Sequence, residues 1–331
     1  MTDAIARRFH RFAETEAKGH APLYEILAHG VAADPEMRAF LAEMPPDKQQ
    51  PNLLFAALRF VCGTPAGADE FRAAFDRHRD AIRAQMLKRR TQTNEPARCA
   101  VLLPVLARLR GPLALLEVGA SAGLCLLPDR YGYAYEGHRP FGPEPVFPCR
   151  ANAATPVPAA VPRIAWRAGL DLNPLDLQND DDMAWLETLV WPDQTERLAR
   201  LRAAIAVART DPPRIAAGDL LTALPALAAE APPEATLVVF HTAVLAYIAD
   251  AAARAAFAQT IRAHKAVWIS NEAPFVFPDI AAKLKAQGPK GAFLLAVDGE
   301  PVAWTGPHGA WIDWIAGDTN AIIPRSREKN A

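Results

Sequence analysis

Cysteine is scarce in this chain of 331 residues, which has only Cys62, Cys99, Cys125 and Cys149. The four are far apart, form no Cys-x-x-Cys pair and have no close histidine partner, which excludes the common zinc-binding patterns and a disulfide framework. We therefore expect four free thiols and no metal site.

Long hydrophobic runs are also missing. No uncharged apolar stretch approaches the roughly 20 residues that a membrane-spanning helix needs. The N-terminus, with Arg7, Arg8 and Arg11, lacks the apolar core of a signal peptide. The formal net charge is only -1, and 51% of the residues are hydrophobic. These features favour a globular, cytoplasmic protein of two domains, because one domain takes roughly 100–200 residues.

A broad basic face with exposed aromatic residues, which nucleic-acid binding favours, is not apparent. The densest cationic cluster, Arg83, Lys88, Arg89 and Arg90, ends a helical pattern. Cations at that position offset the negative end of a helix, so we expect a solvated helix end. We expect no membrane partner and find no strong nucleic-acid signal, and the sequence gives no indication of the oligomeric state.

Residues 1–94 are predicted to form an all-helical N-terminal domain. Apolar residues recur there at helical spacing, for example Leu23, Ile26, Leu27 and Val31. Asn52 precedes an apolar stretch at residues 53–61 and is expected to cap that helix. No strand pattern interrupts these helices.

Residues 95–331 are predicted to form an α/β domain. From residue 111, short apolar runs that end in Gly, Asp or Asn alternate with helical stretches, which is typical of parallel βαβ units. Five parallel strands are expected, at residues 113–118, 164–170, 214–219, 236–241 and 266–271. Residues 292–297 and 301–305 flank an Asp298-Gly299 turn and predict an antiparallel hairpin. The expected fold is Rossmann-like, with a mostly parallel seven-stranded sheet that ends in this hairpin.

A proline-rich insertion, residues 125–163, separates the first two expected strands. Tyr131, Tyr133 and Tyr135 alternate there with small or polar residues. A period of two places the three rings on one face. We expect a β-ribbon or an ordered loop over the sheet, and a lid is the alternative.

Three acidic residues mark the ends of the first three expected strands. Ligands of open α/β sheets bind beyond these ends. The first strand runs into E-V-G-A-S-A-G at residues 117–123, whose glycines let backbone approach a ligand. Asp171 can accept hydrogen bonds from ribose hydroxyls, and Asp219 can accept one from an adenine amino group. Each acid alone is as well explained as a helix cap or turn residue, but together they predict an adenosyl site.

With these stretches the chain resembles the class I S-adenosylmethionine-dependent methyltransferase superfamily. The resemblance implies S-adenosylmethionine as cofactor, with its methionine part at Glu117, Gly119, Ser121 and Gly123, its ribose at Asp171 and its adenine at Asp219. Two features depart from the superfamily pattern. Ser121 replaces the usual middle glycine, and Asp171 follows Glu117 by 54 residues instead of roughly 20. Glu136, at the shorter distance, is a rival ribose ligand.

Six stretches carry a second resemblance that spans nearly the full chain: QQPNLLFAALRF, LLEVGASAGL, GLDLNPLDL, LVWPDQ, VVFHTAVLAY and WISNEAP. In them the chain is similar to an uncharacterised bacterial family, domain-of-unknown-function family 2332. This resemblance implies the fold and brings no substrate.

The fourth and fifth expected strands end in side chains that suit catalysis or substrate contact. His241 is predicted to be a general base for a hydroxyl or amine acceptor, because histidine changes charge near neutral pH. A hydrogen-bonded structural histidine is the alternative. Asn271 and Glu272 are predicted to contact the substrate or merely to end the strand. The sulfonium of the cofactor is already activated, so no motif is needed that would identify the small-molecule acceptor.

Two other functions fit parts of the pattern. Residues 119–123 match G-x-S-x-G, the nucleophile elbow of serine hydrolases, with Ser121 as nucleophile and Asp298 and His308 as later partners. About 110 helical residues ahead of the first strand argue against this hypothesis. A non-catalytic Rossmann-like binding or sensor protein for an adenosyl ligand is the other alternative, because a fold does not determine function.

Overall fold

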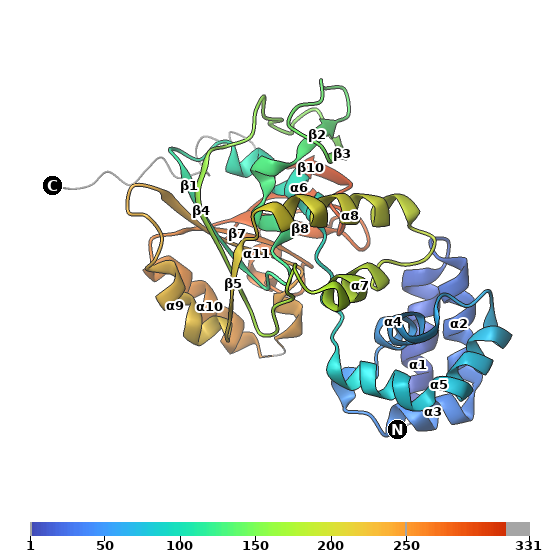
Figure 1. Ribbon diagram of the computed structural model, residues 1–331. Helices are drawn as coiled ribbons and strands as arrows, with labels where there is room; N and C mark the ends of the chain where they lie inside the picture. Colours follow the sequence, from blue (N-terminus) through green and yellow to red (C-terminus); the bar gives the residue numbers. More distant parts are fainter. Residues whose placement is uncertain (1, 249, 316–331) are drawn as a thin grey trace. The chain divides into compact units, whose positions relative to one another are not determined.

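The computed structural model describes residues 2–248 and 250–315, which form two compact units (Figure 1). Among these residues, unit 1 comprises those up to Thr93 together with Asn179–Arg202, and unit 2 comprises the rest from Asn94 onward. The sequence places the boundary after residue 94 and assigns residues 179–202 to the second domain. In the structure these residues pack with the helices of unit 1.

Unit 1 is helical. Proline occupies the first position of three of its helices, where a missing amide proton costs nothing. The helical elements are α1 (Thr2–Phe12), a π-helical turn η1 (Ala13–Ala17), α2 (Pro22–Ala33), α3 (Pro35–Ala42), the 3-10 turn η2 (Pro46–Lys48), α4 (Pro51–Cys62), α5 (Ala68–Lys88), α7 (Asp180–Thr188) and the first half of α8 (Thr195–Thr210).

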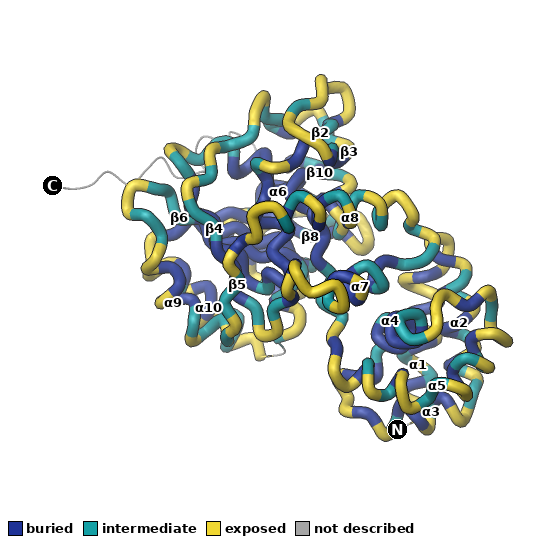
Figure 2. The backbone as a smooth tube through the Cα atoms, viewed as in Figure 1, coloured by how far each residue is buried: buried dark blue, intermediate teal, exposed yellow. Residues whose placement is uncertain are grey.

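The core of unit 1 is aromatic, and its helices turn their buried sides toward it (Figure 2). Phe55 lies at its centre. Its ring centroid is 6.0 Å from that of Phe9, 4.8 Å from that of Tyr24 and 5.7 Å from that of Phe71. Burying one such ring contributes about 1.5–3 kcal/mol, so this cluster is a main source of stability in unit 1.

Two sequence-based predictions in unit 1 are wrong. Asn52 does not cap α4, because Gln50 is the N-cap residue and the Asn52 Oδ1 instead accepts a hydrogen bond from Trp191 Nε1 at 3.0 Å. Arg89 is not part of a solvated helix end, because it is only 4% exposed. Its guanidinium forms ion pairs with Asp181 and Asp182 at the start of α7.

Unit 2 contains a ten-stranded sheet in the order β2-β3-β10-β9-β8-β7-β6-β1-β4-β5. Its strands are β1 (Leu113–Val118), β2 (Gly132–Tyr135), β3 (Val146–Ala151), β4 (Ile164–Asp171), β5 (Arg214–Ala217), β6 (Thr236–Thr242), β7 (Val267–Glu272), β8 (Phe293–Val297), β9 (Glu300–Thr305) and β10 (Trp311–Trp314). The five strands β5-β4-β1-β6-β7 are parallel. Their order is that of doubly wound α/β sheets, which confirms the expected mixed α/β class.

The expected hairpin is confirmed as β8 and β9 around Asp298 and Gly299, which have φ angles of 51° and 82°. The expected count of seven strands is too low for the described residues. The proline-rich insertion supplies β2 and β3, which pair with each other in parallel, and β3 joins β10. The insertion therefore extends the sheet at its edge, and the rings of Tyr131, Tyr133 and Tyr135 are buried.

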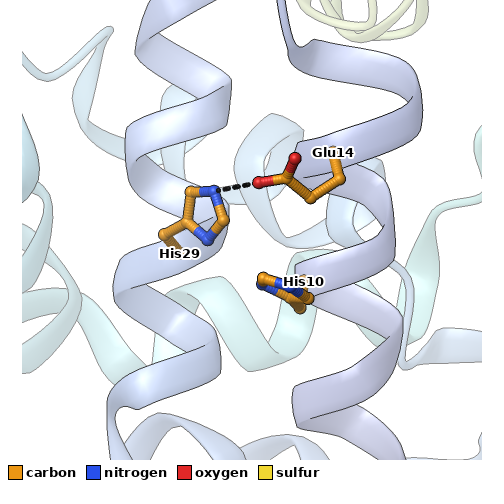
Figure 3. A group of neighbouring side chains, drawn as sticks. All are labelled: His10, Glu14 and His29. Carbon is orange, nitrogen blue, oxygen red and sulfur yellow. Dashed lines mark ion pairs between the residues drawn. The ribbon is translucent and has the colours of Figure 1, made fainter.

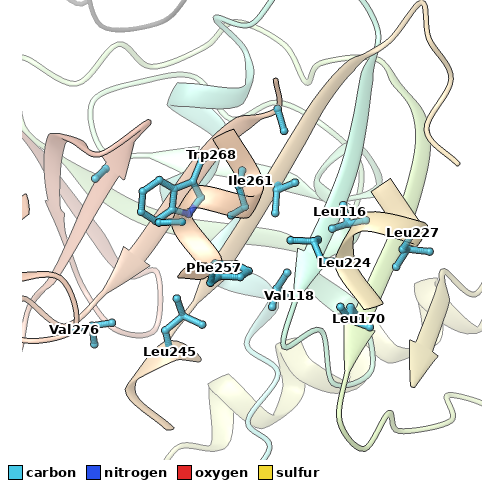
Figure 4. Packing of buried hydrophobic residues seen from close by; sticks show 14 of the residues in the cluster. Leu116, Val118, Leu170, Leu224, Leu227, Leu245, Phe257, Ile261, Trp268 and Val276 are labelled. Atoms are coloured by element: carbon cyan, nitrogen blue, oxygen red, sulfur yellow. The ribbon is translucent and has the colours of Figure 1, made fainter. Parts of the chain in front are cut away.

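Helices of unit 2 complete the core. They are the 3-10 turns η3 (Pro96–Arg98), η4 (Leu124–Leu126), η5 (Pro128–Arg130) and η6 (Leu245–Tyr247), the helices α6 (Cys99–Leu106), α9 (Leu220–Ala228), α10 (Ala251–Ala263) and α11 (Pro278–Ala281), and the second half of α8. Leu116 and Val118 of β1 pack with Leu224 of α9 and Phe257 of α10 in one apolar cluster (Figure 4). Every residue of α6 is buried.

All four cysteines are free thiols, and Cys62 is the exposed one. Among the described residues, no helix is both long and apolar enough to cross a bilayer.

Candidate functional site

The bend that follows β1 forms the centre of the candidate site. Gly119, Ser121 and Gly123 all adopt left-handed backbone conformations, with φ angles of 73°, 52° and 75°. This region is uncommon for a serine. The Ser121 amide donates to Asp171 Oδ2 at 2.8 Å, and the amides of Gly119 and Ala120 donate to the carbonyl of Leu170. The end of β4 thus holds the bend in place.

Asp171 joins two neighbouring strand ends. Besides Ser121, it accepts a hydrogen bond from the Asn173 amide at Oδ1, at 2.8 Å. Gly169 pairs with Glu117 across β1 and β4. Asp171, two residues beyond Gly169, therefore points to the same face of the sheet as Glu117. The structure brings Glu117, Ser121 and Asp171 together at the ends of β1 and β4.

Glu117 is a buried carboxyl group with an incomplete set of partners. It is 2% exposed, and its Oε2 atom has no hydrogen-bond partner. Burial raises the pKa of Glu117 well above 4.5; the neighbouring Cys125 thiol raises it further, Arg98 lowers it, and Asp171 adds a smaller increase. An unsatisfied buried carboxyl of this kind is costly to the folded chain.

A row of buried polar groups continues from Glu117 along the same face. The Arg98 guanidinium donates to the carbonyl of Thr242 at 3.1 Å and to its hydroxyl at 3.3 Å. Asn271 pairs with Thr242 across β6 and β7. The Asn271 Oδ1 accepts from the Thr305 hydroxyl at 2.7 Å, but its Nδ2 has no partner. This row therefore contains two buried polar atoms without a hydrogen-bond partner, one on Glu117 and one on Asn271.

His241 lies on the opposite face of the sheet. It is 0% exposed, and its Nε2 accepts a hydrogen bond from Trp268 Nε1 at 2.9 Å. An indole nitrogen can only donate, so the His241 proton is on Nδ1, which lies 2.7 Å from Glu272 Oε1. Both ring nitrogens are thus engaged inside the core. This geometry matches the structural alternative for His241.

Glu272 also accepts hydrogen bonds from backbone amides. Its Oε1 accepts from the amides of Val244 and Leu245 at 2.9 and 3.1 Å, which anchors the turn after β6. Its Oε2 is buried without a partner. Because successive residues of a strand point to opposite faces, Glu272 lies on the same face of the sheet as His241, whereas Asn271 lies on the same face as Glu117.

Asp219 follows β5, next to the end of β4. The Gly218 amide donates to the Asp171 carbonyl at 2.9 Å, which keeps the two strand ends adjacent. The side chain of Asp219 is exposed and caps α9, since its Oδ1 accepts from the Leu221 amide at 2.8 Å. The three predicted acids therefore stand at three adjacent strand ends, but only Glu117 is buried.

Apolar side chains occupy the space beside the glycines of the bend. A Cβ atom at Gly119 would lie 2.3 Å from Val244 Cγ2, and one at Gly123 would lie 2.7 Å from both Ile215 and Pro213. In this conformation the glycines are required for packing. The sequence interpretation, that they admit a ligand, is not needed to explain them.

Asp298, one of the predicted hydrolase partners, does not lie near Ser121. The Asp298 Oδ1 accepts from the Trp268 amide at 2.9 Å, at the start of β7. Ser121 follows the end of β1, and the central strands are parallel, so Asp298 and Ser121 lie at opposite ends of the sheet. Glu136, the rival ribose ligand, is exposed after β2, a strand at the outer edge of the sheet.

A pocket of about 470 Å³ lies elsewhere in unit 2. It is lined by Ala107, Arg108 and residues 156–162, which lead into the starts of β1 and β4. Glu117 and Asp171 are at the other ends of these strands.

A family profile described as an uncharacterized protein conserved in bacteria, DUF2332, matches residues 6–314. The chain belongs to the DUF2332 family. No curated protein and no solved structure matches it. The DUF2332 match covers the described parts of both units, so the helical unit is as much a part of this family as the sheet.

Several residues that shape the candidate site were not predicted from the sequence. Arg98 and Thr242 complete the polar row beside Glu117, and Trp268 fixes the tautomer of His241. One signal for Arg98 was available, because a lone cation directly precedes the apolar segment 99–106. The sequence gives no such signal for Trp268, because a tryptophan in an apolar strand is also expected where it only packs in the core.

Proposed function

We propose that unit 2 binds S-adenosylmethionine and that the protein transfers its methyl group to a small molecule. The observation that carries this proposal is the buried, orphaned Glu117 Oε2 at the end of the first strand of a doubly wound sheet, beside a left-handed bend. S-Adenosylmethionine carries an ammonium and a sulfonium group. A buried carboxyl that lacks a partner suits such a cation, because the pair offsets the cost of burial.

The residues at the strand ends fit the cofactor in part. Glu117 would accept hydrogen bonds from the ammonium group. Asp171 would accept those of the ribose, because it ends the strand next to β1 on the same face as Glu117. Asp219 would accept one from the adenine amino group. Val244 lies against Gly119, so the turn after β6 would have to shift to admit the methionine part.

The cofactor, when bound, supplies an activated methyl group. The remaining task of the chain is to hold the acceptor in line and to exclude water. Asn271 is the proposed substrate contact, because its unpartnered Nδ2 lies on the Glu117 face. His241 and Glu272 face the other side, and the contacts of His241 leave neither nitrogen to take a proton in this conformation.

The two contacts of His241, with Glu272 and Trp268, favour a second function. This function is the binding of an adenosyl ligand without catalysis. Without an available base, an acceptor would have to arrive already deprotonated. A binding or sensor protein needs no such acceptor, and the same three acids would hold its ligand.

Calorimetric titration of S-adenosylmethionine into the full chain tests both functions. Glu117→Gln and Asp171→Asn are each expected to weaken binding about ten- to a hundredfold, the value of a charged hydrogen bond. Glu136→Gln, which changes an exposed acid, is the control and is expected to bind as the wild type does.

Formation of S-adenosylhomocysteine in the presence of small-molecule nucleophiles then separates the two functions. Turnover that depends on an acceptor supports the methyltransferase. Binding without turnover on any acceptor supports the sensor. No binding to the wild type would contradict both.

A further inference from the structure

Three metal-ligating side chains gather on the surface of unit 1, far from the sheet in sequence (Figure 3). His10 and Glu14 project from the continuous segment formed by α1 and η1, and His29 projects from α2. The Nε2 of His29 is 3.3 Å from Glu14 Oε1, and the ring centroids of His10 and His29 are 5.2 Å apart. One ligand atom of each residue lies within 4.8 Å of the other two.

The backbone is unusual where Glu14 is placed. The helix widens into a π-helical turn at Ala13–Ala17, closed by a 2.9 Å hydrogen bond from the Lys18 amide to the Ala13 carbonyl. Such turns are rare and frequently occur at functional sites. Residues four apart share one face of a helix, so His10 and Glu14 both meet His29 on α2.

The chemistry of the three groups is that of a zinc site. Two imidazoles and one glutamate, with an open fourth position, form the protein ligand set of several zinc enzymes. Tetrahedral Zn²⁺ bound at 2.0–2.2 Å holds its ligand atoms roughly 3.4 Å apart. His29 Nε2 and Glu14 Oε1, 3.3 Å apart, already have this spacing. The side chain of His10 is exposed, so it can close its remaining distance of up to about 1.4 Å by small rotations.

The two carboxylate oxygens of Glu14 have different neighbours. The Lys18 ammonium group lies 2.7 Å from Oε2. The other oxygen, Oε1, faces His29. A metal ion can therefore bind Oε1 while Lys18 keeps Oε2.

We propose that His10, Glu14 and His29 form a binding site for Zn²⁺ on the helical unit. The site is independent of the proposed cofactor site in unit 2. Water would fill the open coordination position. The ion would link α1 to α2, which are otherwise held together by packing.

Titration of zinc chloride into the chelator-treated full chain, followed by calorimetry, tests this site. All proteins carry Cys62→Ser, because the exposed thiol of Cys62 could bind zinc by itself. One Zn²⁺ per chain is expected. His10→Ala, His29→Ala and Glu14→Gln are each expected to weaken binding at least about tenfold, since even outer-shell changes cost that much.

Two controls separate ligation from other effects. Lys18→Ala breaks the same ion pair as Glu14→Gln but removes no ligand, so it is expected to retain zinc binding. His138→Ala removes an exposed histidine of unit 2 and is also expected to retain it. Circular dichroism confirms that each variant folds. Unchanged affinity in His29→Ala, or the absence of a one-to-one site in the wild type, would overturn the proposal.

Discussion

The buried Oε2 of Glu117 has no hydrogen-bond partner, and this predicts how the stability of the chain depends on pH in the absence of a ligand. Burial raises the pKa of Glu117 above its ordinary value of 4.5. The folded chain therefore binds this proton more tightly than the unfolded chain, and the free energy of unfolding falls as the pH rises above about 4.5. Glu117→Gln removes the titration while keeping the shape of the side chain.

The variant is therefore expected to be more stable than the wild type at pH 8 and to lose this advantage toward pH 4.5. Glutamine still places a neutral polar group there, so the variant regains only the extra cost of ionising the buried carboxyl, and the expected gain at pH 8 is about 1–3 kcal/mol. A variant that is more stable but binds S-adenosylmethionine more weakly would show the trade-off typical of functional residues.

Urea unfolding followed by tryptophan fluorescence, at several pH values from 4.5 to 8, measures this difference. Glu136→Gln is the control, because Glu136 is exposed and its replacement is expected to change the free energy of unfolding little at any pH. A gain for Glu117→Gln that is equal at pH 4.5 and pH 8, or a loss of stability at pH 8, would contradict a raised pKa of Glu117.

Two further substitutions test the packing of the site. Trp268→Phe removes the hydrogen bond that Nε2 of the buried His241 accepts and is expected to lower the free energy of unfolding by about 1–3 kcal/mol; urea unfolding at pH 7 that shows no loss would contradict the assigned tautomer. Gly119→Ala is expected to destabilise by about 1–3 kcal/mol more than Gly137→Ala. Both glycines have positive φ angles, but only the Cβ at 119 would meet Val244. Equal melting curves for the two variants would show that Val244 can move away from a Cβ atom at residue 119 with little loss of stability.

Much of the central sheet could be predicted because its signal is local. The strand at Leu113–Val118 matches the expected range, and the hairpin follows from the Asp298-Gly299 turn. The strands of the proline-rich insertion were missed as parts of the sheet. β3 pairs with β10, more than 150 residues later in the chain, and local periodicity does not reveal such pairing.

The sequence predicts the acids of the candidate site at the ends of strands. It does not predict that the site residues divide between the two faces of the sheet. Glu117 and Asn271 share one face while His241 and Glu272 share the other, and this division depends on the register between β1, β6 and β7. A shift of one residue would exchange the faces. The sequence alone does not specify that register.

Contacts between distant segments explain the other differences. Arg89 is buried because Asp181 and Asp182 reach it from α7, about 90 residues later. The spacing of His10 and Glu14 was visible in the sequence, but His29 joins them only through the packing of α2 on α1. The expectation of no metal site came from the four cysteines, which are far apart and have no close histidine partner.

A crystal structure of the chain with S-adenosylhomocysteine would show whether the strand ends hold an adenosyl ligand. We expect the ligand at the ends of β1 and β4, with its ammonium group at Glu117, its ribose at Asp171 and Val244 moved away from Gly119. A ligand bound instead in the pocket at residues 156–162, or none bound at saturating concentration, would contradict this expectation.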